Sequence, residues 1–123
     1  MIYEEICTYE VCKLAKEKGF NEKCYHYYQK GVLESDGCFN RYNKGIDSIC
    51  SAPTQSLLQR WLREEKGIHI SVFPNMASSF EFDYIVYNKG DKFWNPIYTA
   101  HSDFATYELA LEDALKYALK NLI

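Results

Sequence analysis

The sequence contains no long hydrophobic run and no excess of positive charge. Its uninterrupted apolar stretches, such as 84–87, are only a few residues long, whereas about 20 apolar residues are needed to span a bilayer. The 14 Lys and Arg residues are outnumbered by 17 Asp and Glu residues, so no net positive field attracts a nucleic-acid backbone or an anionic membrane surface. We therefore expect no membrane association, and nucleic acid is disfavoured as a partner.

Motifs that announce metals, cofactors or disulfides are also lacking. The six glycines are dispersed along the chain rather than clustered before a helix, which disfavours a phosphate-binding loop. The five cysteines are odd in number and include no C-x-x-C pair, which argues against a disulfide framework and for a reducing compartment. The segment 1–6 carries two carboxylates and lacks the basic and apolar regions of a signal peptide. We expect a cytoplasmic protein with no metal and no cofactor.

What the sequence does contain is the composition of one folded domain. Its 123 residues are 47% hydrophobic and 16% aromatic, which predicts a single domain over 1–123. Three amphipathic helices are expected: Thr8 caps the first, which Gly19 ends; Ser51 caps the second, which Gly67 ends; and Thr106 caps the third, which runs to about residue 122.

Strands are predicted between these helices. The aromatic run 24–28 is expected to return as a hairpin after Lys30 and Gly31, 34–50 is a long loop with at most a short strand, and 68–73, 80–87 and 93–98 alternate as strands. Pro96 restricts the last strand to a sheet edge or a bulge. These elements predict an α+β fold, in which about three helices pack mainly on one face of a small antiparallel sheet.

Aromatic residues on alternating strands suggest a binding surface. Phe73, Tyr87 and Trp94 cannot all face the core if their strands alternate, and exposed Tyr and Trp dominate protein interfaces. We identify these three residues as the candidate binding surface. The alternative is that the last helix or the 34–50 region covers them.

A candidate polar patch lies on the same strands. Glu81 and Asp83 share one strand face and could approach His69 and Ser71 on the neighbouring strand. An antiparallel sheet covered on one side carries such residues on its other face in any case. Replacing Glu81 and Asp83 together with alanine is therefore expected to leave stability nearly unchanged.

No catalytic residue is predicted. Cys24 and His26 are close in sequence, but residues i and i+2 of a strand lie about 7 Å apart, beyond direct hydrogen-bond reach. His101 and Asp103 form an H-x-D pair, which alone is a weak metal signal because a metal site needs three or four converging ligands. The sequence does not decide whether the protein is an enzyme, although it favours a non-catalytic role.

Three blocks of sequence carry a resemblance. They are TYEVCKLAKEKGF (8–20), SAPTQSLLQRWLREEKGIHI (51–70) and YELALEDALKYALKNLI (107–123), which together cover 50 of the 123 residues. Through them the chain resembles a group of small uncharacterised proteins of Bacteroides-type gut bacteria and their phages and mobile elements. The resemblance implies a bacterial or phage cytoplasmic setting and an accessory role, and it implies no activity and no catalytic residue.

These observations favour a small cytosolic protein-interaction module. It would contact a protein partner, or a second copy of itself, through exposed aromatic residues and the wide apolar face of the last helix. One alternative is a small enzyme or ligand-binding protein with a sheet-lined pocket at His69, Ser71, Glu81 and Asp83. A second alternative is a DNA-associated accessory factor of a phage or mobile element, which the charge balance disfavours.

Overall fold

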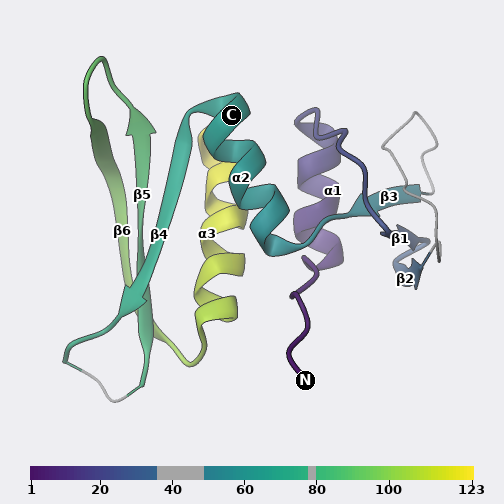
Figure 1. The fold of residues 1–123 in the computed structure, drawn as a ribbon, viewed down its shortest axis with the longest axis horizontal. Helices are drawn as coiled ribbons and strands as arrows, with labels where there is room; N and C mark the ends of the chain where they lie inside the picture. The colour runs from purple at the N-terminus through teal and green to yellow at the C-terminus, as the bar shows by residue number, and fades with distance from the viewer. Residues whose placement is uncertain (36–48, 78–79) are drawn as a thin grey trace. The chain divides into compact units, whose positions relative to one another are not determined.

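The computed structural model describes residues 1–35, 49–77 and 80–123, and in these residues it contains three helices and two three-stranded antiparallel sheets (Figure 1). The predicted α+β fold class is confirmed. The chain divides into two compact units, Met1–Leu57 and Leu58–Ile123. That the whole chain folds as one domain stays a prediction.

The first unit combines one helix with a sheet of strand order β2-β1-β3. Its elements are α1 (Tyr9–Glu17), β1 (His26–Gln29), β2 (Val32–Ser35) and β3 (Ile49–Ala52). Thr8 caps α1 as predicted, because its Oγ1 accepts a hydrogen bond from the backbone N–H of Val11 at 3.4 Å. Lys30 and Gly31 have positive φ angles of 52° and 79°, as a type I′ turn requires. The predicted hairpin between β1 and β2 is confirmed.

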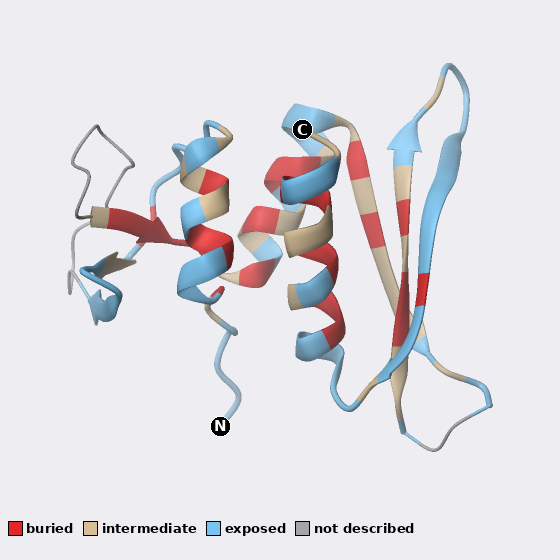
Figure 2. Cartoon of the chain, turned by 180° about the vertical axis from the view of Figure 1, so that it is seen from behind, coloured by how far each residue is buried: buried red, intermediate tan, exposed pale blue. Residues whose placement is uncertain are grey.

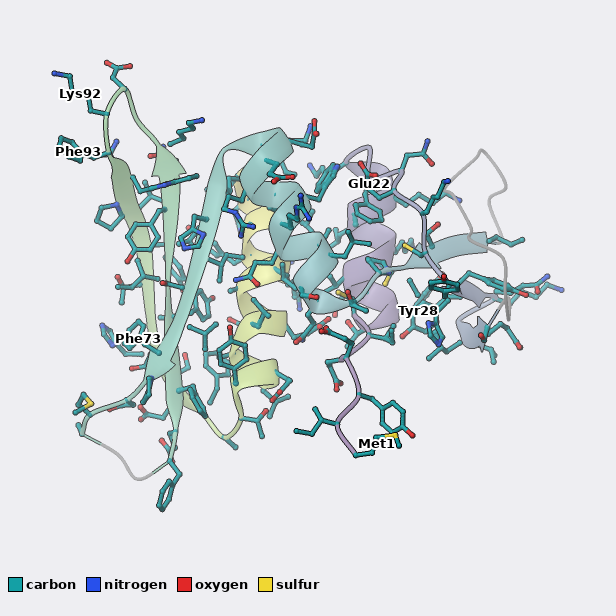
Figure 3. All side chains as sticks on the ribbon, viewed as in Figure 1. Met1, Glu22, Tyr28, Phe73, Lys92 and Phe93 are labelled. Atoms are coloured by element: carbon teal, nitrogen blue, oxygen red, sulfur yellow. The ribbon has the colours of Figure 1, made fainter. Side chains whose placement is uncertain are left out.

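Side chains attach α1 to this sheet. The Lys16 ammonium donates a hydrogen bond to the backbone carbonyl of Ile49 at 2.6 Å. The hydroxyl of Tyr28, which is labelled in Figure 3, donates to the carbonyl of Cys7 at 2.9 Å. The ring of Tyr28 also lies 5.4 Å from that of Tyr9 at the start of α1. Contacts from both ends of the helix therefore fix its position on the sheet.

The second helix, α2 (Gln55–Lys66), begins later than predicted. Ser51 was expected to cap it, but Ser51 lies in β3, where it pairs with Tyr27 of β1. Thr54 takes the capping position, and its Oγ1 accepts a hydrogen bond from the backbone N–H of Leu57 at 3.2 Å. Pairing with β1 thus extends β3 to Ala52, over residues that the sequence predicts to begin a helix. Of the predicted 34–50 loop, residues 36–48 lie outside the described residues.

The second unit is a meander covered by a helix. It contains β4 (Ile68–Pro74), β5 (Phe82–Lys89), β6 (Trp94–Phe104) and α3 (Tyr107–Asn121), with strand order β4-β5-β6. Gly67, at φ +65°, ends α2, and Thr106 caps α3 by accepting the backbone N–H of Leu109 at 3.1 Å. β6 is an edge strand with a register shift beside Pro96. All three features agree with the sequence analysis.

The core of this unit lies between α3 and one face of its sheet. Figure 2 shows a continuous stripe of buried residues along α3. The stripe consists of Ala110, Leu111, Ala114, Leu115, Ala118 and Leu119. It faces Ile70, Tyr84 and Val86, which are buried on alternate positions of β4 and β5. Phe80, the first residue of the predicted strand 80–87, precedes β5 and is exposed.

The strands are distributed over two sheets rather than the single sheet expected. Each sheet is built from strands that follow one another along the chain, and α2 separates β3 from β4. Sequential strands pair readily when short turns connect them. An intervening helix removes that advantage, and no ladder in the described residues joins the two sets of strands.

Candidate functional site

The candidate site is the face of the β4-β5-β6 sheet that points away from α3, called here the outer face. Because side chains alternate along a strand, the residues between the buried positions of β4 and β5 belong to it. The register places His69 opposite Tyr87, Ser71 opposite Ile85, and Phe73 opposite Asp83. Figure 3 shows the Phe73 side chain on the side of β4 away from α3. The predicted surface and polar-patch residues on β4 therefore share this face.

Three rings gather at one end of the outer face. The His69 ring stacks on Tyr87, with centroids 5.8 Å apart and an interplanar angle of 29°. Its centroid also lies 5.6 Å from that of Trp94. We call His69, Tyr87 and Trp94 the aromatic cluster. Phe73 lies four residues from His69 on β4, about 13 Å along the strand, so the structure brings two of the three predicted surface residues together.

His69 occupies this cluster as a neutral ring. Burial, followed by the positive charge of Arg63, lowers the pKa of His69 below its usual 6.5. Its Nδ1 is buried and has no hydrogen-bond partner among the described residues. A neutral imidazole adds no net charge between the two larger rings, so the centre of the cluster is aromatic and uncharged. This arrangement suits packing against an apolar group.

The predicted polar patch does not assemble as one group. Ser71 lies opposite Ile85. Glu81 precedes β5, and its backbone carbonyl accepts a hydrogen bond from the backbone N–H of Asn75 at 2.8 Å. Asp83 faces Phe73 rather than His69. The expected sheet-lined pocket at these four residues is therefore not formed by direct contacts among them.

Asp83 instead forms a different cluster. It is buried to 3% exposure and accepts hydrogen bonds from the Asn75 amide at 3.1 Å and from the backbone N–H of Asp103 at 3.2 Å. His101 Nδ1 lies 3.4 Å from the same carboxylate, and the Asn75 amide also donates to the Asp103 carboxylate. The expectation that Asp83 lies on a solvated face is wrong. The cause is the irregular pairing of β5 with β6 beside Asp83, which turns Asp103 toward it.

Sequence reasoning missed Asn75, although a signal was present. Asn75 follows Pro74, and its Oδ1 accepts the backbone N–H of Ala77 at 2.8 Å, as Asn does in turns. His101 and Asp103, whose H-x-D spacing is a weak metal signal, belong to this cluster. Within 1–35, 49–77 and 80–123, no group of three or more His, Cys, Asp or Glu side chains is placed to hold a metal ion. The cluster ties the β4–β5 connection to β6.

A cavity of about 750 Å³ lies in the first unit. Its lining includes the start of β1 around Cys24 and His26, the end of β3 at Ala52, and the N-terminal segment at Ile6. Burial, followed by the electrostatic interactions with Cys12 and Cys50, raises the pKa of Cys24 to about 12. Cys24 is therefore a neutral thiol at pH 7, which disfavours it as a nucleophile because the thiolate is the reactive form.

We expect Cys24 and Cys50 to resist alkylation in the folded protein. Burial also raises the pKa of Cys50 from 9.0 to about 12, and such a shift lowers the thiolate fraction at pH 8 by about a thousandfold. Iodoacetamide labelling, followed by mass spectrometry of the separated peptides, should be at least about a hundredfold slower for both thiols than in the denatured chain. Labelling at the rate of the denatured chain would contradict the burial of these residues.

The same shifts have a pH consequence. A folded-state pKa above the unfolded value means that the folded state holds the proton more tightly. The contribution of both thiols to stability is therefore present below pH 9 and is lost as the pH rises toward 12.

The remaining expectations concern charge and membranes. Arg60 on α2 pairs with Glu64 at 3.1 Å, in the i,i+4 arrangement of an ordinary surface pair. Among the helices formed by the described residues, none is long and apolar enough to cross a membrane.

Searches of protein-family models, curated proteins and solved structures find no match to this chain. Its resemblance to the Bacteroides-type group stays a prediction.

Proposed function

We propose that this protein is a non-catalytic protein-interaction module whose outer face binds a protein partner. The observation that carries the proposal is the aromatic cluster of His69, Tyr87 and Trp94 on the sheet face that α3 does not occupy. A bacterial or phage accessory role in the cytoplasm is part of the same proposal.

The composition of the outer face supports a protein partner. Trp94 is 39% exposed, and Trp and Tyr are the residues most enriched among interface hot spots. The ring of His69 is neutral and lies between them, while Lys89, which pairs with Trp94 on the edge strand, is exposed. An uncharged aromatic centre beside an exposed charge is the usual anatomy of an interface.

We expect loss of the cluster to abolish partner binding. A photo-crosslinking residue in place of Phe73 would trap the partner in cells that make the protein, and the purified partner would then be titrated by calorimetry. The double variant Tyr87→Ala/Trp94→Ala should bind at least about thirtyfold more weakly, since one hot spot alone contributes about 2 kcal/mol.

Tyr25→Ala is the matched control for this experiment. Tyr25 is a 57% exposed aromatic residue of the first unit, so its removal deletes a similar ring outside the outer face. The control should bind as the wild type does. Equal losses in both variants, or wild-type binding by the double variant at unchanged stability, would refute the outer face as the binding surface.

A further inference from the structure

The hydrogen-bonding directions of β5 show which backbone groups of the second sheet point outward. At one end of the β4–β5 ladder, the backbone N–H of Lys89 donates to the carbonyl of Gly67 at 2.8 Å. Beyond the other end of the ladder, the backbone N–H of Asn75 donates to the carbonyl of Glu81 at 2.8 Å. In an antiparallel ladder, alternate residues bond to opposite neighbours. Odd-numbered residues of β5 therefore bond to β4, and even-numbered residues of β5 bond to β6.

The β4 edge is already engaged. Its even-numbered residues point their backbone groups away from β5, and the carbonyl of Ile70 accepts a hydrogen bond from the Gln59 side chain of α2 at 3.0 Å. The carbonyl of Ile70 is therefore not available to an added strand. The opposite edge, β6, is the better position for a further strand.

The outward groups of β6 centre on Thr99. Tyr98 pairs with Val86 and Ala100 with Tyr84, both even-numbered residues of β5, so the backbone N–H and C=O of Thr99 between them point away from the sheet. Register shifts on either side confine the regular segment to 98–100. A further strand that pairs with this regular segment would therefore be centred on Thr99.

The first nine residues of β6 lack the charges that usually protect an edge. No Lys, Arg, Asp or Glu occurs in 94–102, although edge strands are commonly blunted by such residues. Figure 2 shows β6 exposed along nearly its whole length, and Ile97 and Tyr98 are 41% and 37% exposed. An uncharged, partly apolar strand can lie beside an identical strand without electrostatic repulsion.

We propose that β6 pairs antiparallel with β6 of a second copy of this chain, about a two-fold axis at Thr99, to form a continuous six-stranded sheet. This register exchanges two backbone hydrogen bonds between the two Thr99 residues. It places Tyr98 of each copy opposite Ala100 of the other.

The side chains favour this register for self-pairing. Tyr98 stacks on Tyr117 of α3 with ring centroids 3.9 Å apart, so its large ring occupies the space beside the strand on that face. Ala100 is the small residue that can lie opposite such a ring. Moving the axis by one residue to Tyr98 would instead place two tyrosine rings opposite each other. A second copy thus places a small residue opposite each Tyr98 ring, and the inference does not depend on the outer face binding another protein.

Charge substitutions at the axis test the proposal. Sedimentation of the purified wild-type chain over a dilution series should show a reversible dimer. Thr99→Lys and Thr99→Glu each place two like-charged side chains opposite each other across the axis, with Cβ atoms about 5 Å apart, and each should weaken the dimer at least about tenfold. An equimolar mixture of the two variants should restore a dimer that contains one copy of each.

Ser71→Lys is the matched control. Ser71, Ile85 and Thr99 lie in one row across the sheet, so this variant adds the same charge to the same face at the opposite edge. It should dimerise as the wild type does. A wild-type chain that is monomeric at every concentration, charge variants that dimerise normally, or a mixture that fails to form the mixed dimer would each overturn the proposal. The mixture also shows that neither variant merely fails to fold.

Discussion

Replacing Tyr84 with alanine is expected to lower the free energy of unfolding by about 3–5 kcal/mol, the range for aromatic-to-alanine changes in cores. Tyr84 is fully buried between the sheet and α3, and its ring lies about 6 Å from those of Tyr98 and Phe104. Its hydroxyl donates to Asp113 of α3 at 2.7 Å. The substitution removes both the packing and the link to the helix. Chemical denaturation followed by circular dichroism measures the loss.

Tyr84→Phe separates the two contributions. The ring remains, and the carboxylate of Asp113 is exposed enough to regain water, so we expect a loss of only about 1 kcal/mol. If the phenylalanine variant were as unstable as the alanine variant, the hydrogen bond rather than the ring would hold α3 on the sheet.

The same pair of variants has a pH signature. Burial, followed by the hydrogen bond to Asp113, raises the pKa of Tyr84 above its ordinary value of 10. The folded state therefore holds the phenolic proton more tightly, and the contribution of this group is present below pH 10 and is lost as the pH rises above it. Tyr84→Phe should show less loss of stability in alkali than the wild type.

Replacing Asp83 with alanine is expected to lower the free energy of unfolding by about 1–3 kcal/mol, the range for losing hydrogen bonds to a charged group. Asp83 accepts hydrogen bonds from the Asn75 amide and the Asp103 backbone. Without the carboxylate, the β4–β5 connection loses its link to the irregular end of β6. Denaturation measured at pH 7 gives the change.

Glu81→Ala is the matched control, because it removes a neighbouring carboxylate that precedes β5. Glu81 is half-exposed and contributes its backbone carbonyl, which alanine retains. We expect its stability to lie within about 0.5 kcal/mol of the wild type. Equal effects of the two substitutions would show that the Asp83 cluster does not support the fold. The sequence predicts that stability depends on neither carboxylate. The burial and hydrogen bonds of Asp83 argue against this prediction for Asp83, but not for Glu81.

The sequence by itself determined the local structure of this protein. Thr8 and Thr106 cap helices, Gly67 ends one, and Lys30 with Gly31 forms a hairpin turn, all as predicted. Each of these features depends on hydrogen bonds or φ preferences within a few residues. The apolar stripe of α3 was predictable for the same reason, since its period follows from the helix itself.

The tertiary structure alone decided how these elements combine. Strand pairing absorbed Ser51 into β3, and register shifts in β6 brought Asp103 and His101 to Asp83. The aromatic cluster was half predictable, because alternation placed Tyr87 away from the core, whereas its contact with Trp94 through His69 depends on the register of three strands. Register shifts and ladder partners are set by residues far apart in sequence, and a shift of one residue exchanges the two faces of a strand. Local pattern therefore specified the type of most elements, and long-range pairing specified their bounds and the site.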